Sequence, residues 1–263
     1  MSFAAGMYYF AWGGENSPRP PVILIHGAGG THLNWPPQIR RLNGQRIFAP
    51  DLPGHGRSGD VGRQSIAAYA ADIARFMDAL RMPAAVIAGH SMGAAIAMTL
   101  ALEHPPLVLA LALLGVAPRM RVAPAFLDGL EDPSTLVSTV ERMTEYSYSP
   151  RTDPRFKELA ARRMAETRHP VLHGDFLACD LFDLSADLAR IHAPTLVLAS
   201  DEDRMVPVRL SRQIQQQIPG AQLRLIAGAG HMFMLEQPEA VAAALIDFLD
   251  TLPDRPVEPG QTL

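Results

Sequence analysis

Residues 86–94 read VIAGHSMGA, and this short stretch indicates the fold class most directly. Small apolar residues precede Gly89 and an alanine-rich segment follows Gly93, which indicates a buried strand that turns sharply into a helix with Ser91 at the corner. A residue at such a corner is forced toward positive φ, so its neighbours two positions away have to be small. Ser91 would then lie above the end of a sheet and at a helix N-terminus, where a developing negative charge is stabilised.

Strand patterns alternate with helix patterns along most of the chain. The predicted strands are 7–12, 21–26, 46–50, 84–89, 107–115, 195–199 and 222–226, and the predicted helices are 33–42, 65–80, 91–102, 208–217 and 238–252. This alternation predicts an α/β protein with a mainly parallel central sheet and helices on both faces. In such sheets ligands bind at the carboxyl ends of the strands. Functional residues are therefore expected directly after the strands.

The segment 117–187 has a different character. Strand patterns vanish there, and helical pieces broken by prolines take their place. We predict a small helical cap that is inserted into a core made of residues 1–116 and 188–252. The tail 253–263 is rich in proline and polar residues, and we expect it to be mobile.

Composition excludes several classes of function. The chain has 263 residues, a formal net charge of −4 and a pI near 6.1, so it has no basic footprint for nucleic acid or an anionic membrane. The N-terminal residues have no basic region and no long apolar core, so we expect no signal peptide, and the apolar tract 105–118 is too short to span a bilayer. We expect a cytoplasmic protein with a small-molecule partner, and the sequence does not indicate its oligomeric state. The single cysteine, Cys179, excludes an internal disulfide and is interpreted as a small buried hydrophobe.

A serine nucleophile needs a base, and the base needs a group that orients it. Of the 9 histidines, His231 follows the predicted strand 222–226 in the glycine-rich loop AGAGHMF, and His26 ends an earlier strand. The turn after strand 195–199 reads SDEDRMVP and offers Asp201, Glu202 and Asp203. Each of these acidic residues alone is more simply a solvated turn residue, and the spacing leaves the choice among them open.

Backbone N–H groups are the candidate donors for an oxyanion. Met92 directly follows Ser91, and its N–H would begin the helix. A second donor, Ala28 N–H, would come from the glycine-rich turn after His26. Loss of one such donor typically costs about 2.7–4 kcal/mol of transition-state stabilisation. This turn is therefore expected to matter nearly as much as the side chains.

These residues resemble the α/β-hydrolase superfamily over nearly the whole chain. The ordered matches are His26-Gly27, DLPGHGRSG at 51–59, the elbow 89–93 and Gly230-His231. The resemblance implies the order Ser91, acid, His231, and the family pattern Gly-x-x-Asp-x-x-x-Pro selects Asp203, with Ser200 in the place of the usual glycine. It further implies that His26 and 51–59 brace the site without reacting, and that no metal or organic cofactor is needed.

The resemblance implies a serine carboxylesterase that hydrolyses small to medium esters through an acyl-enzyme. Alternatives on the same fold are a carbon–carbon bond hydrolase of the meta-cleavage type, a lactonase, an acyl transferase, a perhydrolase and a slow-turnover ligand receptor. The residues expected to line an apolar substrate pocket are Trp35, Met92, Phe126, Tyr146, Tyr148, Phe176, Val206 and Met232.

Overall fold

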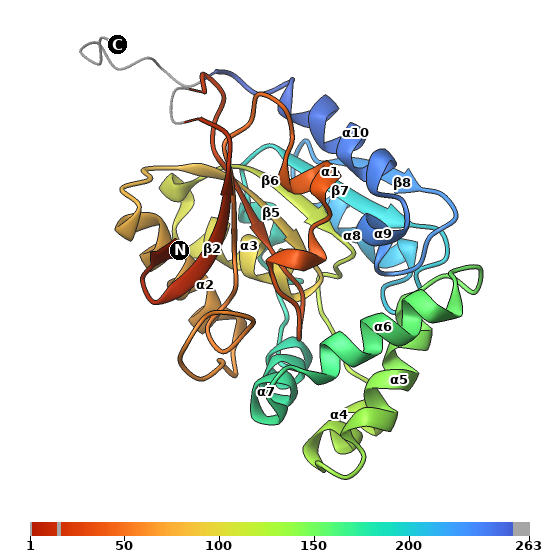
Figure 1. Cartoon of the computed structure of the whole chain (residues 1–263). Helices are drawn as coiled ribbons and strands as arrows, with labels where there is room; N and C mark the ends of the chain where they lie inside the picture. Colours follow the sequence, from red (N-terminus) through yellow and green to blue (C-terminus); the bar gives the residue numbers. More distant parts are fainter. Residues whose placement is uncertain (1, 15–16, 255–263) are drawn as a thin grey trace.

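The computed structural model describes residues 2–14 and 17–254. Its core is an 8-stranded sheet with the order β1-β2-β4-β3-β5-β6-β7-β8 (Figure 1). The strands are β1 (Phe3–Ala4), β2 (Met7–Trp12), β3 (Val22–Ile25), β4 (Ile47–Pro50), β5 (Ala85–His90), β6 (Val108–Leu114), β7 (Thr195–Ser200) and β8 (Gln222–Ile226). β1 pairs antiparallel with β2, and β2 with β4, whereas the remaining pairs are parallel. The parallel strands therefore all end at one edge of the sheet.

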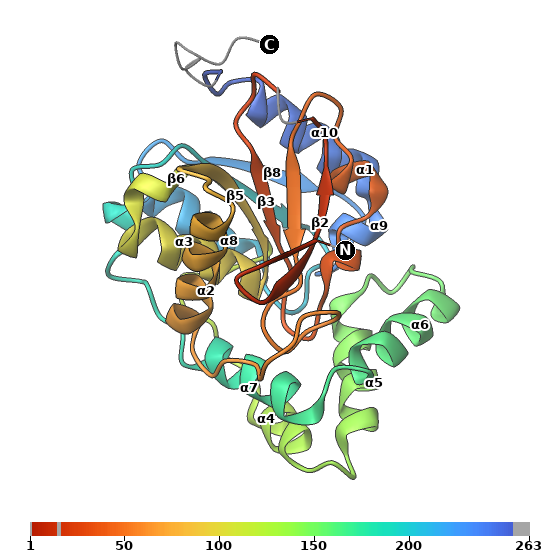
Figure 2. The same cartoon turned by 60° about the vertical axis from the view of Figure 1, so that its left-hand side comes forward.

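Helices cover both faces of this sheet (Figures 1 and 2). The core helices are α1 (Pro37–Arg40), α2 (Ile66–Ala79), α3 (Met92–Glu103), α8 (Val208–Gln217), α9 (Phe233–Glu236) and α10 (Pro238–Leu249). α2, α3 and α8 lie on one face, and α1, α9 and α10 lie on the other. In β3, Ile23 and Ile25 pack toward the first face while Val22 and Leu24 pack toward the second, because side chains alternate along a strand. The mainly parallel, helix-flanked sheet predicted from the sequence is confirmed.

Four helices lie between β6 and β7, where the sequence predicts the cap. They are α4 (Pro124–Glu131), α5 (Leu136–Ser147), α6 (Pro154–Ala165) and α7 (His169–Asp180). They gather below the carboxyl edge of the sheet in Figure 1 and pack around a small apolar cluster of their own. Leu130, Val140 and Leu172 are fully buried in that cluster. The helices thus form a layer over the strand ends, which is the position that a cap requires.

Some predicted elements are corrected by the structure. The helix expected over 33–42 is replaced by a short 3-10 turn, His32–Asn34, and the four-residue helix α1. Pro36 and Pro37 explain this break, since proline disfavours helical geometry in the residue before it and lacks an N–H. The last helix ends at Leu249 rather than at residue 252, and the sequence analysis misses β1 and α9. The mobility expected for the tail concerns residues that, from 255 onward, lie outside the described part of the chain.

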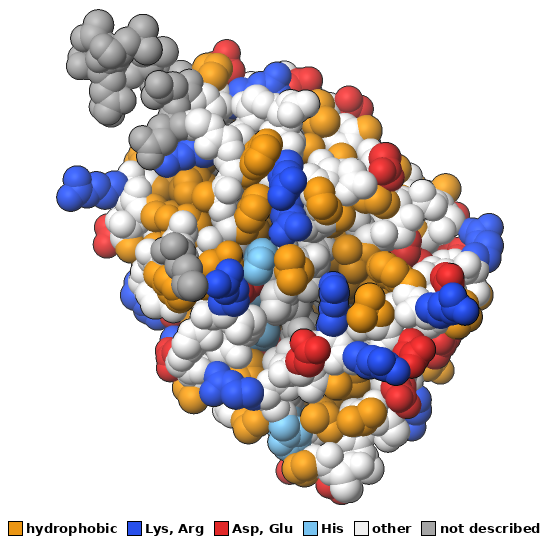
Figure 3. Space-filling model, in the orientation of Figure 1, with side chains coloured by type: hydrophobic (Ala, Val, Ile, Leu, Met, Phe, Trp, Pro, Cys, Tyr) orange, Lys and Arg blue, Asp and Glu red, His pale blue; other side chains and the backbone are white. Residues whose placement is uncertain are grey.

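No helix in residues 2–14 and 17–254 is both long and apolar enough to cross a bilayer. On the face shown in Figure 3, acidic and basic side chains occur together over both the core and the cap. The cytoplasmic location stays a prediction.

Candidate active site

Ser91 occupies the strained corner that the sequence predicts between β5 and α3. Its backbone has φ 53° and ψ −116°, and its N–H donates to Leu114 O at 2.8 Å. A Cβ at Gly89 would overlap the Gly93 backbone, and a Cβ at Gly93 would overlap the Ile25 backbone. Glycine is therefore required at both positions by close backbone approach. The turn holds Ser91 at the carboxyl edge of the sheet, in the middle of the parallel strands.

Asp203 and His231 form a buried hydrogen-bonded pair. Asp203 Oδ2 lies 2.8 Å from His231 Nδ1, and Asp203 Oδ1 accepts from the N–H groups of Met205 and Val206 at 2.8 and 2.7 Å. The carboxylate orientation is thus fixed by its own turn. Because Nδ1 donates to the carboxylate, Nε2 of the neutral imidazole is left as an acceptor. A histidine held in this way is suited to accept a proton from a nucleophile.

The two other acidic residues of the turn have different partners. Asp201 accepts from Gly228 N–H at 2.7 Å, and Glu202 bonds the side chains of Ser149 and Arg151 at the base of the cap. Of the three acidic residues that the spacing left open, Asp203 is the one whose carboxylate meets His231. Its selection by the family pattern agrees with this geometry.

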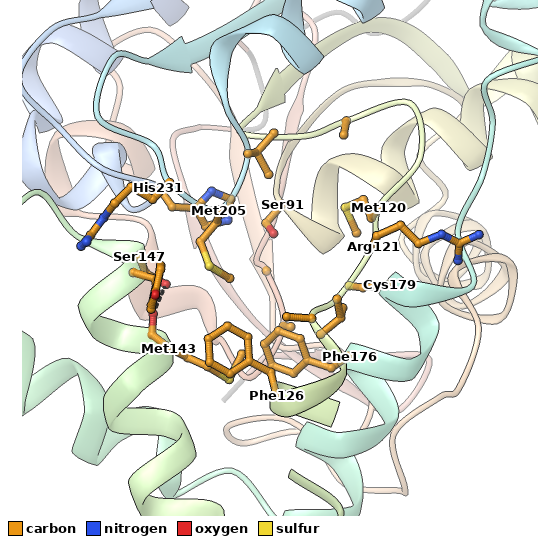
Figure 4. A pocket seen from close by; sticks show the side chains of 18 of the residues that line it. Ser91, Met120, Arg121, Phe126, Met143, Ser147, Phe176, Cys179, Met205 and His231 are labelled. Atoms are coloured by element: carbon orange, nitrogen blue, oxygen red, sulfur yellow. Dashed lines mark hydrogen bonds between the residues drawn. The ribbon is translucent and has the colours of Figure 1, made fainter. Parts of the chain in front are cut away.

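Ser91 and His231 line one cavity at the strand ends. Figure 4 shows both side chains on the core side of that cavity. The end of β6 joins them: Leu114 binds Ser91 N–H, and a Cβ on the next residue, Gly115, would lie 3.2 Å from the His231 ring. His90 Nε2 lies 3.0 Å from His231 O and therefore donates to it. The sequence analysis missed this role for His90, which lies next to Ser91 in the chain.

The turn after β3 directs the Ala28 N–H. Gly27 O accepts from His26 Nδ1 at 2.8 Å and from Gly30 N–H at 3.0 Å. In a trans peptide the C=O and the N–H point in opposite directions, so these bonds aim Ala28 N–H away from His26. Ala28 lines the same cavity as Ser91. Met92 is the first residue of α3, where N–H groups have no acceptor within the helix.

His26 is held in its neutral form. Its Nε2 accepts from Leu52 N–H at 3.0 Å while Nδ1 donates to Gly27 O. Complete burial is the main cause that lowers the pKa of His26 to about 4, and the neighbouring His55 lowers it further. In the loop 51–59, Asp51 is fully buried and accepts from His32 and from Arg57 N–H. Neither His26 nor Asp51 lines the cavity, in agreement with the bracing roles implied by the resemblance.

The cavity has a volume of about 500 Å³ and a largely apolar wall. Five of the predicted wall residues line it, namely Phe126, Tyr146, Phe176, Val206 and Met232. In Figure 4 the rings of Phe126 and Phe176 stand opposite Ser91 on the cap side. The wall residues that the sequence analysis missed include five that contain sulfur, namely Met120, Met143, Met164, Met205 and Cys179, and three arginines, Arg119, Arg121 and Arg204. Cys179 is buried as expected, and burial raises the pKa of its thiol.

The prediction was wrong for Trp35, Met92 and Tyr148, which are not among the lining residues. Met92 is fully buried in the core on the face of α2 and α3. Trp35 follows the 3-10 turn and is buried in the core on the face of α1 and α10. Tyr148 ends α5 and packs edge-on against Phe156, with ring centroids 5.6 Å apart. Trp35 and Tyr148 lie in the core because burial of a large apolar surface stabilises the fold more there than at the mouth of a cavity.

This sheet, with a serine elbow and a buried Asp–His pair at its carboxyl edge, has the architecture of the α/β hydrolases. The chain belongs to the Alpha/beta hydrolase family, whose model matches residues 22–244. It is therefore a member of a family of hydrolytic enzymes.

Individual relatives carry different activities in their names. The chain is 30% identical to a protein of Caulobacter sp. (strain K31) named "Putative carbamate hydrolase RutD", over 93% of this chain and 96% of the relative. It is 29% identical to 2-hydroxymuconate semialdehyde hydrolase of Pseudomonas putida, over 87% and 86% of the two chains. Among solved structures, a thermophilic esterase aligns with a TM-score of 0.79 and 30% identity, covering 93% of this chain and 98% of its own.

Proposed function

We propose that the protein is a carboxylic-ester hydrolase that works through an acyl-enzyme on Ser91. The observation that carries this proposal is the bond of 2.8 Å between Asp203 and His231 in a cavity that Ser91 also lines. A serine hydroxyl is a poor nucleophile at neutral pH, and an oriented imidazole beside it supplies the missing base. The solved esterase with 30% identity supports the same chemistry.

In the proposed reaction Ser91 Oγ attacks the acyl carbon and His231 Nε2 takes its proton. The tetrahedral oxyanion is stabilised by the N–H groups of Ala28 and Met92. His231 then protonates the leaving alcohol, and in the second half it activates water to release the acid. Asp203 stabilises the imidazolium that forms in each half and keeps the imidazole in the required tautomer. No proton transfer in this scheme needs a further side chain.

The volume and the lining of the cavity indicate which class of ester it can bind. A volume of about 500 Å³ accepts a small to medium substrate rather than a long polymer. Three aromatic residues and five methionines contribute to the largely apolar wall, and methionine adapts its shape to different ligands. We infer apolar acyl and alcohol groups with broad tolerance of shape.

The test is a panel of p-nitrophenyl esters of increasing acyl length, assayed with the wild type and with Ser91→Ala. The wild type is expected to turn over short and medium esters many times, with Ser91→Ala reduced by at least about 10⁴-fold. Equal turnover by the two proteins would overturn the proposal. A burst of one equivalent without further turnover would point instead to a slow ligand receptor.

Carbon–carbon bond hydrolysis of the meta-cleavage type is the second candidate. The relative from Pseudomonas putida that is named 2-hydroxymuconate semialdehyde hydrolase favours it. The same assay separates the two when it includes a ring-fission ketone and an aryl carbamate. A kcat/KM for the ketone that exceeds those of all esters would favour the second candidate. Preference for the carbamate would retain the acyl-enzyme scheme but change the leaving group.

A further inference from the structure

Both polar groups of the Gly29 backbone are bonded to the cap. Gly29 N–H donates to Asp175 Oδ2 at 2.8 Å, and Gly29 O accepts from Thr167 Oγ1 at 3.1 Å. Asp175 belongs to α7, and Thr167 lies between α6 and α7. Gly29 has φ +62°, and a Cβ there would lie 2.6 Å from the side chain of Leu172. The cap is thus packed directly against the residue that follows Ala28.

Asp175 makes further hydrogen bonds in the protein interior besides the one to Gly29. Its side chain is completely buried, Oδ2 also lies 2.7 Å from His55 Nε2, and Oδ1 accepts from Tyr69 OH at 2.6 Å. A buried carboxylate is costly unless it is paired and hydrogen-bonded, and here both oxygens are satisfied. Helix α7 of the cap is therefore tied through this one side chain to α2, to the loop 51–59 and to the turn after β3.

His55 is the cationic partner in this cluster. Its Nδ1 lies 3.1 Å from Pro53 O and its Nε2 faces Asp175, so both ring nitrogens meet acceptors and both donate. Burial lowers the pKa of His55, but Asp175, Pro53 O and Asp51 together raise it, and the net shift is upward. The carboxylate is held in place by an imidazolium that cannot itself reach the cavity, because His55 is not among the lining residues.

The two sides of the Ala28 residue are held by different parts of the molecule. On the amino side, Gly27 O is fixed by His26 and Gly30, which belong to the core. On the carboxyl side, the peptide between Ala28 and Gly29 is fixed by Asp175 of the cap. Ala28 N–H lies in the same planar peptide as Gly27 O, and the Ala28 dihedrals join this peptide to the next one, which the cap holds. A shift of α7 would therefore act on the donor peptide through Ala28, against the hold of His26 and Gly30.

We propose that Asp175 and Thr167 are positioning residues through which the seated cap sets the oxyanion turn. The inference rests on the proposed function, since it gives Ala28 N–H the role of an oxyanion donor. Neither side chain touches substrate in this scheme. Their effect is on the transition state, where the oxyanion exists, and much less on binding of the uncharged ester.

The cleanest variant is Thr167→Val, which removes the donor to Gly29 O and keeps shape and charge. Its control is Thr144→Val in α5, a buried cap threonine whose hydroxyl donates to Val140 O within its own helix at 2.8 Å, whereas Thr167 is half-buried. Asp175→Asn removes the charge that holds His55. The double variant Asp175→Asn/His55→Gln removes both charges of the pair, so it covers the case in which the single Asn variant does not fold.

Two measurements do not depend on an ester substrate. Hydrogen exchange followed by mass spectrometry reports the protection of the turn 26–31, and the rate of Ser91 labelling by an alkyl fluorophosphonate reports the oxyanion site, since the phosphoryl oxygen takes the place of the oxyanion. With esters, kcat and KM are separated. Loss of a whole donor costs about 10²–10³ in kcat, so we expect about 10–100-fold for Asp175→Asn and about 3–10-fold for Thr167→Val, with KM nearly unchanged.

The expected result is faster exchange of the turn and slower labelling in Thr167→Val and in the Asp175 variants, with Thr144→Val like the wild type. Wild-type exchange or wild-type labelling rates in Thr167→Val and the Asp175 variants would overturn the inference. If the wild type is labelled at Ser91 but hydrolyses no ester, the proposed function fails while exchange and labelling still decide about the cap. If the wild type is not labelled, the oxyanion role of Ala28 and the inference fall together.

Discussion

The hydroxyl of Ser200 donates to the carbonyl of Gly230 at 2.6 Å, inside the protein and out of contact with solvent. Ser200 ends β7, just before the turn of Asp203, and Gly230 precedes His231. The bond therefore ties together the two loops that carry the acid and the base. Ser200 occupies the position at which the family pattern has glycine. Glycine has no hydroxyl, so it could not make this bond.

Ser200→Ala is expected to lower the free energy of unfolding by about 1–3 kcal/mol, since a buried carbonyl loses its partner. A smaller loss of kcat should accompany it, because His231 becomes less firmly placed. Urea unfolding and ester kinetics measure the two effects. Ser138→Ala, an exposed serine of α5, serves as control and should change stability by less than about 0.5 kcal/mol. Equal stability of the two variants would contradict the role of the bond.

Asp203→Asn is expected to abolish activity without unfolding the protein. The Asn carbonyl would keep the bonds from Met205 and Val206 N–H, so the amide NH₂ would face His231 Nδ1 and force the wrong tautomer. We expect a loss of about 10⁴-fold in kcat, with an unfolding midpoint close to that of the wild type. Asp201→Asn is the matched control, since Asp201 lies in the same turn as Asp203 but its carboxylate bonds the N–H of Gly228 and not His231, so nearly full activity is expected. A similar loss in both variants would contradict the assignment of Asp203.

His26 is expected to make the fold sensitive to acid. Its pKa of about 4 in the folded state lies below the ordinary 6.5, so the unfolded chain binds a proton that the folded protein excludes between these values. The stabilisation is fully present above about pH 6.5 and is lost as pH falls toward 4. A shift of this size corresponds to about 3 kcal/mol. Burial moves the pKa of His90 in the same direction, so His90 adds to the effect.

Urea unfolding at several pH values between about 7.5 and 4.5 tests this dependence. His26→Asn should be less stable at neutral pH and show a shallower fall with acid than the wild type. His104→Asn, at an exposed position after α3, should keep the wild-type slope. A slope in His26→Asn that matches the wild type would show that other groups cause the acid sensitivity.

Gly93→Ala is expected to prevent correct folding, because its Cβ would overlap the backbone of β3 at Ile25 and no flexible side chain lies there to move aside. Gly59→Ala, where no atom lies within 4 Å of the added Cβ, should fold and retain activity. Soluble yield and circular dichroism distinguish the two. A folded, active Gly93→Ala would contradict the close packing of the elbow on β3.

The sheet, the elbow and the candidate base His231 could be predicted from local patterns, whereas Asp203 was selected from three acidic residues only by the resemblance to the family pattern. Strand ends are readable from apolar runs, and parallel strands bring their ends to one edge without any knowledge of side-chain packing. The residues of the cavity wall were harder to predict from the sequence. Trp35 and Tyr148 turn into the core, while Met120 and Met205 reach the cavity, and these choices depend on how the cap lies over the sheet.

Asp175 illustrates the same limit. In the sequence it is one acidic residue directly before the apolar run FLAC at 176–179, with its partners His55 and Tyr69 more than a hundred positions away. No periodicity or motif links these positions. Only the placement of α7 brings the three side chains together, which is why this cluster became visible in the structure alone.

Phe126→Ala is expected to enlarge the cap side of the cavity and shift ester preference toward longer acyl chains. Its ring faces Ser91 from the cap and packs against Tyr146 at the wall, with ring centroids 6.0 Å apart. Space for additional methylene groups is worth about 0.8 kcal/mol for each one that becomes buried, or about fourfold in kcat/KM. Ratios of kcat/KM across an acyl series measure the shift. Tyr148→Phe, which alters a core ring outside the cavity wall, should leave those ratios unchanged. A shift in Tyr148→Phe together with none in Phe126→Ala would mean that the acyl group does not lie against the cap.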